Sequence, residues 1–106
     1  MTAGQGSDLH PLATQDINDI WAYIADDSPQ AARRVREEIL AAIRALVSFP
    51  NVGHKRPDLT SLPLRFSVVR EYRIAYVPDE KPLWVLAMMH GRRSPRVMAA
   101  ILRGRE

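Results

Sequence analysis

The sequence predicts an α+β fold in which an N-terminal helical hairpin packs on an antiparallel sheet of three strands, or four with a short edge strand, followed by a short C-terminal helix. Apolar residues recur every three or four positions over residues 11–47, strand-forming runs follow over residues 64–90, and a helix-start signal returns at Ser94. The 106 residues suffice for one hydrophobic core but not for two. We therefore expect one domain over residues 8–106, preceded by a flexible N-terminus over residues 1–7.

The first helix is expected to begin near Pro11, because proline suits the first helical turn, and to continue to Ala25. The residues with helical apolar spacing are Ala13, Ile17, Ile20, Trp21 and Ile24. Asp16 and Asp19 lie early in this helix, where we expect them to face water and to interact with the positive end of the helix dipole.

The second helix is expected from about Pro29 to about Val47, with Ser28 as its N-cap. Its inward stripe consists of Ala32, Val35, Ile39, Ala42, Ile43 and Leu46. Its opposite face carries two pairs spaced four apart, Arg33 with Glu37 and Arg34 with Glu38. Because only a tight turn separates the two helices, they should form a hairpin.

Two strand-forming runs, residues 64–69 and 72–77, are separated by two residues, which predicts an antiparallel hairpin. A two-residue turn would place Phe66 on the same face as Arg73, whereas the apolar pattern favours the face of Ile74. We therefore expect a bulge or a longer turn.

The third run, residues 83–89, is apolar without interruption, which is typical of a strand covered on both faces. It stops at His90-Gly91-Arg92-Arg93, so this strand should deliver cations to the rim of the sheet. Ser94 and Pro95 then start a short amphipathic helix that ends near Gly104. The short additional edge strand is expected at residues 8–10, ahead of the first helix.

Charge is segregated along the chain. Residues 1–53 carry four basic and seven acidic side chains, and residues 54–106 carry eleven and five, so the halves have net charges of −3 and +6. The second half can therefore attract an anionic or acidic partner.

Several classes of protein are excluded by composition and motif. The chain has no cysteine, which excludes disulfides and thiolate metal sites, and it has no nucleotide-binding glycine motif or serine-hydrolase elbow. We expect no metal and no cofactor. No apolar stretch approaches the roughly 20 residues that span a bilayer, so we expect a cytoplasmic protein without a membrane partner.

Six motifs follow one another in order along the chain. They are Ala13, Asp16, Ile17, Ile20, Trp21 and Tyr23-Ile24 in the first helix, the helix start Ser28-Pro29-Gln30-Ala31-Ala32, the turn Leu46-x-x-Phe49-Pro50-x-x-Gly53, the pair Leu64-Arg65, the strand Tyr72-Arg73-Ile74-Ala75-Tyr76 and the strand end His90-Gly91-Arg92. Over about residues 8–103 this ordered set resembles the ParE branch of the RelE/ParE toxin superfamily.

The resemblance implies a bacterial type II toxin that inhibits growth by binding DNA gyrase rather than by catalysis. It also implies a cognate ParD-like antitoxin that wraps the sheet and the hairpin, with operator DNA contacted only through that antitoxin. The candidate residues for binding the target or the antitoxin are Arg65, Arg73, His90, Arg92, Arg93, Arg96 and Arg103, with Arg105 close to them in the sequence. Guanidinium groups can bind carboxylates or phosphates through two hydrogen bonds.

RelE-like relatives on the same scaffold instead cleave mRNA on the ribosome, which is the alternative function, and fold alone does not choose between them. Such an endoribonuclease needs a base, an acid and cations at the phosphate. The candidates would be Arg65, Glu71, Arg73 and His90. Because Gly91 stands where some nuclease relatives have tyrosine, and the C-terminal helix lacks Tyr and His, we expect no catalytic residues.

Two structural interpretations accompany these functional ones. His90 can be a strand-end histidine satisfied by backbone groups, without any catalytic role. The aromatic residues that we expect in the core, because they lie on apolar stripes, are Trp21, Tyr23, Phe49, Tyr72, Tyr76 and Trp84.

Overall fold

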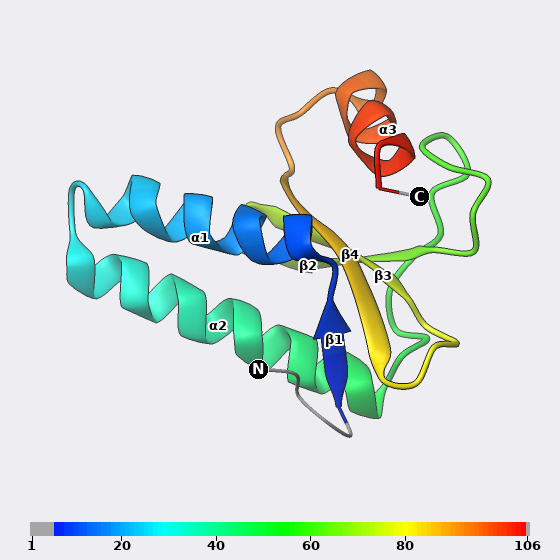
Figure 1. Ribbon diagram of the computed structural model, residues 1–106, viewed down its shortest axis with the longest axis horizontal. Coiled ribbons are helices and arrows are strands. Elements are labelled where there is room, and N and C mark those ends of the chain that lie inside the picture. Colours follow the sequence, from blue (N-terminus) through cyan, green and yellow to red (C-terminus); the bar gives the residue numbers. More distant parts are fainter. Residues whose placement is uncertain (1–5, 106) are drawn as a thin grey trace.

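The computed structural model describes residues 6–105. Its elements are β1 (Ser7–Leu9), α1 (Pro11–Ala25), α2 (Pro29–Ser48), β2 (Arg65–Val69), β3 (Tyr72–Val77), β4 (Leu83–His90) and α3 (Pro95–Arg103). Figure 1 shows α1 and α2 side by side on one face of the sheet, with α3 on the other side of β4. The α+β class and the helical hairpin are confirmed. Of the expected N-terminal tail, residues 1–5 lie outside the described part, and Ser7 is a buried residue of β1.

The helices begin where the sequence places them. Ser28 Oγ accepts a hydrogen bond from Ala31 N at 3.2 Å, and Ser94 Oγ accepts one from Val97 N at 3.2 Å, with proline as the next residue in both cases. These side chains satisfy backbone N–H groups that have no partner inside the helix. The Ser-Pro pairs are therefore N-cap signals that predict helix boundaries correctly.

The sheet has the order β1-β4-β3-β2. The strands β2, β3 and β4 pair antiparallel as expected, but β1 pairs parallel with β4, so the four-stranded sheet is mixed. Parallel neighbours need a long crossover connection. The two helices of the hairpin begin that connection, because the chain leaves β1 for the helical layer and returns to the sheet only at β2.

The expected bulge or longer turn between β2 and β3 is wrong. Only Arg70 and Glu71 lie between the strands, and the pairing runs without a shift from Val69–Tyr72 to Arg65–Tyr76. Arg70 adopts the left-handed backbone region, with φ 53°, and its guanidinium binds Glu38 of α2 at 2.7 and 2.8 Å. Neither of the four-apart pairs expected on α2 forms an ion pair within residues 6–105.

A two-residue turn is tolerated because both faces of the sheet are buried. Under α1 and α2 lies one apolar cluster that includes Ile39, Ile74 and Val85. On the other face, Phe66 and Met89 belong to a second cluster, which contains Met98 and Leu102 of α3, so an inward Phe66 needs no bulge. The register shift occurs instead between β3 and β4, at Ala75/Tyr76. The expectation that residues 83–89 form a strand covered on both faces is confirmed.

The turn after α2 is fixed by the sheet. Buried Tyr76 Oη donates to Pro50 O at 2.7 Å and accepts from Gly53 N at 3.0 Å, while Arg65 Nη1 donates to Gly53 O at 2.7 Å. A Cβ on Gly53 would lie 2.6 Å from Tyr76 Oη, so the backbone can approach the phenol only if this residue is glycine.

The prediction that the aromatic side chains lie in the core holds for Tyr72 and Tyr76, which are buried. It is wrong for Trp21, Tyr23 and Phe49, which are 43%, 82% and 69% exposed. The reason is that α1 faces the sheet along a narrow strip, since Ala13 and Ile17 are its only buried residues, while Phe49 follows the end of α2.

Candidate functional site

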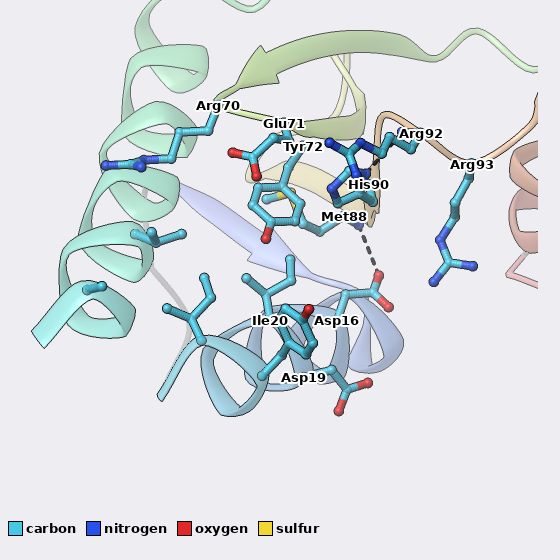
Figure 2. Close-up of a pocket in the computed structure, with 14 residues that line it drawn as sticks. Asp16, Asp19, Ile20, Arg70, Glu71, Tyr72, Met88, His90, Arg92 and Arg93 are labelled. Atoms are coloured by element: carbon cyan, nitrogen blue, oxygen red, sulfur yellow. Dashed lines mark hydrogen bonds between the residues drawn. The ribbon is translucent and has the colours of Figure 1, made fainter. Parts of the chain in front are cut away.

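A groove of about 590 Å³ opens between the helical hairpin and the ends of β3 and β4. Its lining residues come from α1, α2, β3, β4, the β2–β3 turn and the loop after β4 (Figure 2): Asp16, Asp19, Ile20, Tyr23, Ile24, Ala31, Val35, Arg70, Glu71, Tyr72, Met88, His90, Arg92 and Arg93. The lining combines an apolar part, provided by residues such as Ile20, Tyr72 and Met88, with charged side chains. Such a groove suits a partner that has an apolar face flanked by charges.

Exposed arginines gather where β4 ends, as the sequence predicted. Arg92 and Arg93 lie in the loop after the strand, beyond Gly91, and Arg96 and Arg103 lie on α3. All four side chains are exposed, and none has an ion-pair partner within residues 6–105. We refer to these four arginines as the basic surface. Their charges are available to an acidic or anionic partner.

His90 is held by the backbone of the loop that follows it. Its Nδ1 accepts a hydrogen bond from Arg92 N at 3.0 Å, and its carbonyl oxygen accepts one from Arg93 N at 3.1 Å. The imidazole packs edge-on against Tyr72, with ring centroids 5.4 Å apart. In the neutral ring the proton then belongs on Nε2. These contacts agree with the interpretation of His90 as a strand-end histidine satisfied by backbone groups.

Tyr72 forms part of the groove lining beside His90 (Figure 2). Burial raises the pKa of its phenol above the ordinary value, and the charge of neighbouring Glu71 raises the pKa further. Both effects disfavour the phenolate. Tyr72 is therefore a neutral hydroxyl at physiological pH and can donate or accept a hydrogen bond there.

The four residues proposed for a nuclease do not meet in one place. Glu71 and His90 both line the groove, but Arg65 pairs with Tyr76, at the end of the β2–β3 hairpin opposite to its turn. Arg73 is not part of the groove lining, and a Cβ on Gly91 would lie 2.8 Å from its Nη1. Gly91 thus lets the guanidinium of Arg73 rest against the loop backbone, a role the sequence does not reveal.

One ion pair has no signal in the sequence. Asp16 binds Arg105 through both carboxylate oxygens, at 2.5 and 2.9 Å, and it also accepts from Met88 N at 2.9 Å. Asp16 was expected to face water, and that expectation is wrong. No local pattern could have identified the pair, because its members are 89 residues apart.

A family comparison gives this geometry a biological context. Residues 8–95 match the model of the ParE toxin of the type II toxin-antitoxin system parDE, which is most of the chain. The chain belongs to the ParE toxin family. A comparison with individual curated proteins finds no match. The resemblance read from the ordered motifs is confirmed, and ParE membership implies an antitoxin partner.

The ParE match ends at Pro95, the first residue of α3. Arg96, Arg103 and Arg105 therefore lie outside the part of the chain that the family pattern describes. Part of the basic surface and one member of the Asp16–Arg105 pair consequently depend on sequence beyond the match. Among the helices of this ParE chain within residues 6–105, none has the length and hydrophobicity needed to cross a bilayer.

Proposed function

We propose that this ParE toxin inhibits DNA gyrase by binding it through the basic surface, and that a ParD-like antitoxin neutralises it. Membership of the ParE family supports both parts, because the family toxin acts in a toxin-antitoxin pair and the ParE branch resembled by the sequence includes gyrase poisons. Gyrase is a cytoplasmic target, so the toxin is expected to act in the cytoplasm.

The observation that most favours a binding toxin over a catalytic one is the separation of Arg65 from His90. General acid–base catalysis requires its groups to converge on one reacting phosphate. Arg65 pairs with Tyr76 near the start of β2, whereas His90 pairs with Tyr72 beside the β2–β3 turn. Arg65 is also engaged in holding Gly53 O at 2.7 Å. This arrangement favours a toxin that acts by occupying its target.

The groove suits the antitoxin. An amphipathic helix could place apolar side chains against Ile24, Val35 and Tyr72 and acidic side chains against Arg92 and Arg93. Charge complementarity of this kind increases the rate of association and selects against other partners. The same two arginines belong to the basic surface, so a bound antitoxin would cover part of the surface proposed for gyrase.

The decisive experiment measures gyrase supercoiling in the presence of purified toxin. We expect the wild type to inhibit and the Arg92→Glu/Arg93→Glu variant to inhibit about tenfold less or not at all, because charge reversal repels an acidic partner. The matched control is Arg33→Glu/Arg44→Glu, which changes two exposed arginines of α2 and gives the same net charge. Gyrase that is unaffected by the wild-type toxin would contradict the proposal.

A RelE-like mRNA endonuclease is the second candidate, favoured by one observation. Glu71, Tyr72 and His90 line the same groove, with Arg92 beside them (Figure 2). They could supply a base, an acid and a cation to an RNA backbone. Cleavage of ribosome-bound mRNA that is lost in Glu71→Gln and His90→Gln, with gyrase unaffected, would transfer the function to this candidate.

A further inference from the structure

The helix α3 is short and buries few side chains against the sheet. It has nine residues, of which only Met98 and Leu102 are buried. Helices of this length are marginal in water and depend on tertiary contacts. Yet α3 carries Arg96 and Arg103, and the loop before it carries Arg92 and Arg93. The arrangement of the basic surface therefore depends on whatever anchors α3.

The anchor is Arg105, two residues beyond the end of α3. Its guanidinium donates to both carboxylate oxygens of Asp16 on α1, and its Nη1 also donates to Leu86 O of β4 at 3.2 Å. Figure 1 shows α1 and α3 on different sides of β4, so this side chain links the two helical layers. Asp16 thus joins α1, β4 and the C-terminal segment.

The position of this pair follows from the topology. The strand β1 pairs only with residues 83–85 of β4 and then turns into α1. Beyond that point, no strand within residues 6–105 lies beside Met88 N and Leu86 O on the β1 side, and unpaired backbone groups are costly when buried. Asp16 accepts from Met88 N, and Arg105 donates to Leu86 O. The two side chains thus supply the hydrogen bonds that a longer β1 would have made to this edge of β4.

Limited solvent access gives the pair its importance. The side chains of Arg105 and Asp16 are 11% and 18% exposed, whereas the other two ion pairs in residues 6–105 have side chains that are 35–53% exposed. A two-bonded pair that is shielded from water interacts more strongly than an exposed one, and removing one member leaves the other charge without compensation. Breaking this pair should therefore loosen α3.

We propose that Asp16 and Arg105 are positioning residues for the basic surface. Their ion pair fixes α3 against the sheet, and so it sets where Arg96 and Arg103 stand relative to Arg92 and Arg93. Neither Asp16 nor Arg105 belongs to the basic surface as defined above. The proposal rests on the proposed function only for the identity of the bound target, because the anchoring of α3 can be measured without gyrase.

The first test is amide hydrogen exchange in α3. We expect the amides of Met98 and Leu102 to exchange about tenfold faster in Asp16→Asn and in Arg105→Gln. The double variant should exchange no faster than either single variant, because the first change already breaks the pair. The asparagine introduced by Asp16→Asn keeps an oxygen that can accept from Met88 N, so this variant removes the charge with minimal disturbance of the strand edge.

The matched control for this test is Asp19→Asn, which neutralises an exposed carboxylate one turn further along α1 and should leave α3 exchange at the wild-type rate. Protected β3 amides confirm that each variant is folded. Wild-type α3 exchange in both single variants, or effects that multiply in the double variant, would overturn the proposed anchoring.

The second test measures binding to gyrase by the same variants. We expect Asp16→Asn and Arg105→Gln to bind several-fold more weakly, roughly three- to tenfold, and Arg105→Lys to recover part of the loss because it keeps the charge. Faster α3 exchange with unchanged gyrase affinity would overturn the positioning role. If the wild type itself does not bind gyrase, the proposed function fails, while the exchange experiment still decides whether Asp16 and Arg105 anchor α3.

Discussion

The two faces of the sheet are covered in different ways. One face is covered by α1 and α2, whose 15 and 20 residues bury a continuous apolar cluster. The other is covered by α3 and by the segment before β2, with two buried α3 residues and one shielded ion pair. Hydrophobic burial is nondirectional and tolerant, whereas an ion pair depends on geometry. The α3 half of the basic surface, Arg96 and Arg103, is therefore carried by the face that is held less firmly.

The largest effect should come from a cavity on the hairpin face. Ile39→Ala removes most of a fully buried side chain and should lower the free energy of unfolding by roughly 2–5 kcal/mol. Leu102→Ala on the α3 face should cost less, because the loss cannot exceed the free energy with which α3 is docked. Urea denaturation of both variants measures the difference. A greater loss in Leu102→Ala would reverse the comparison of the two faces.

A smaller effect is expected at the turn fixed by Tyr76. Gly53→Ala would place a Cβ 2.6 Å from Tyr76 Oη and 2.8 Å from Phe66 O, which should cost about 1–3 kcal/mol through overpacking. The control is Gly104→Ala, whose nearest neighbouring atom would be 3.5 Å away. Thermal unfolding should show a lower midpoint for Gly53→Ala alone. Equal midpoints would mean that the turn after α2 can shift to accommodate the Cβ, and that this turn is less rigid than its hydrogen bonds to Tyr76 and Arg65 indicate.

A still smaller effect on stability is expected at Gly91, in the loop between β4 and the arginines of the basic surface. In Gly91→Ala the new Cβ meets the guanidinium of Arg73, which is the flexible end of a side chain, so the cost should stay within about 1 kcal/mol. Arg73 should nevertheless move, and the chemical shift of its Nε–H should report the change. An unfolding penalty as large as that of Gly53→Ala would show that the loop after β4 is as constrained as the turn after α2.

The smallest effect should come from the exposed pair between Glu38 and Arg70. The hydrogen bond from Arg70 holds the pKa of Glu38 below its ordinary value. A carboxyl with a depressed pKa stabilises the fold above its unfolded pKa and loses that contribution as the pH falls through the folded value. The midpoint of Glu38→Gln should thus lie slightly below wild type at pH 7 and approach it as the pH falls below the ordinary carboxyl pKa of 4.5. Glu37→Gln is the control, and an equal pH dependence there would remove the assignment to Arg70.

Local chemistry explains what could be predicted. The Ser-Pro pairs at Ser28 and Ser94 cap helices through bonds that span three residues, so the sequence alone locates the helix starts. The apolar run of β4 likewise predicts a strand buried on both faces, and it places Arg92 and Arg93 at the end of the sheet. Each of these features depends on neighbours within one element.

Features that depend on distant partners could not be predicted. The parallel direction of β1 follows from where the helical layer returns the chain, and the plain two-residue turn of β2–β3 follows from a second cluster that shelters Phe66. Asp16 has a typical solvent-facing position in the first turns of a helix, and only Arg105, 89 residues away, changes its role. The groove, too, exists only once α1 lies beside β4.

Asp16 lies at once in the wall of the groove and in the anchor of α3. Thermodynamic linkage then requires reciprocity: a molecule in the groove that strengthens or weakens the hold of Asp16 on Arg105 must itself bind more or less tightly according to whether α3 is docked. A single carboxylate is thus sufficient for communication between two opposite sides of a very small protein, without any hinge or moving domain.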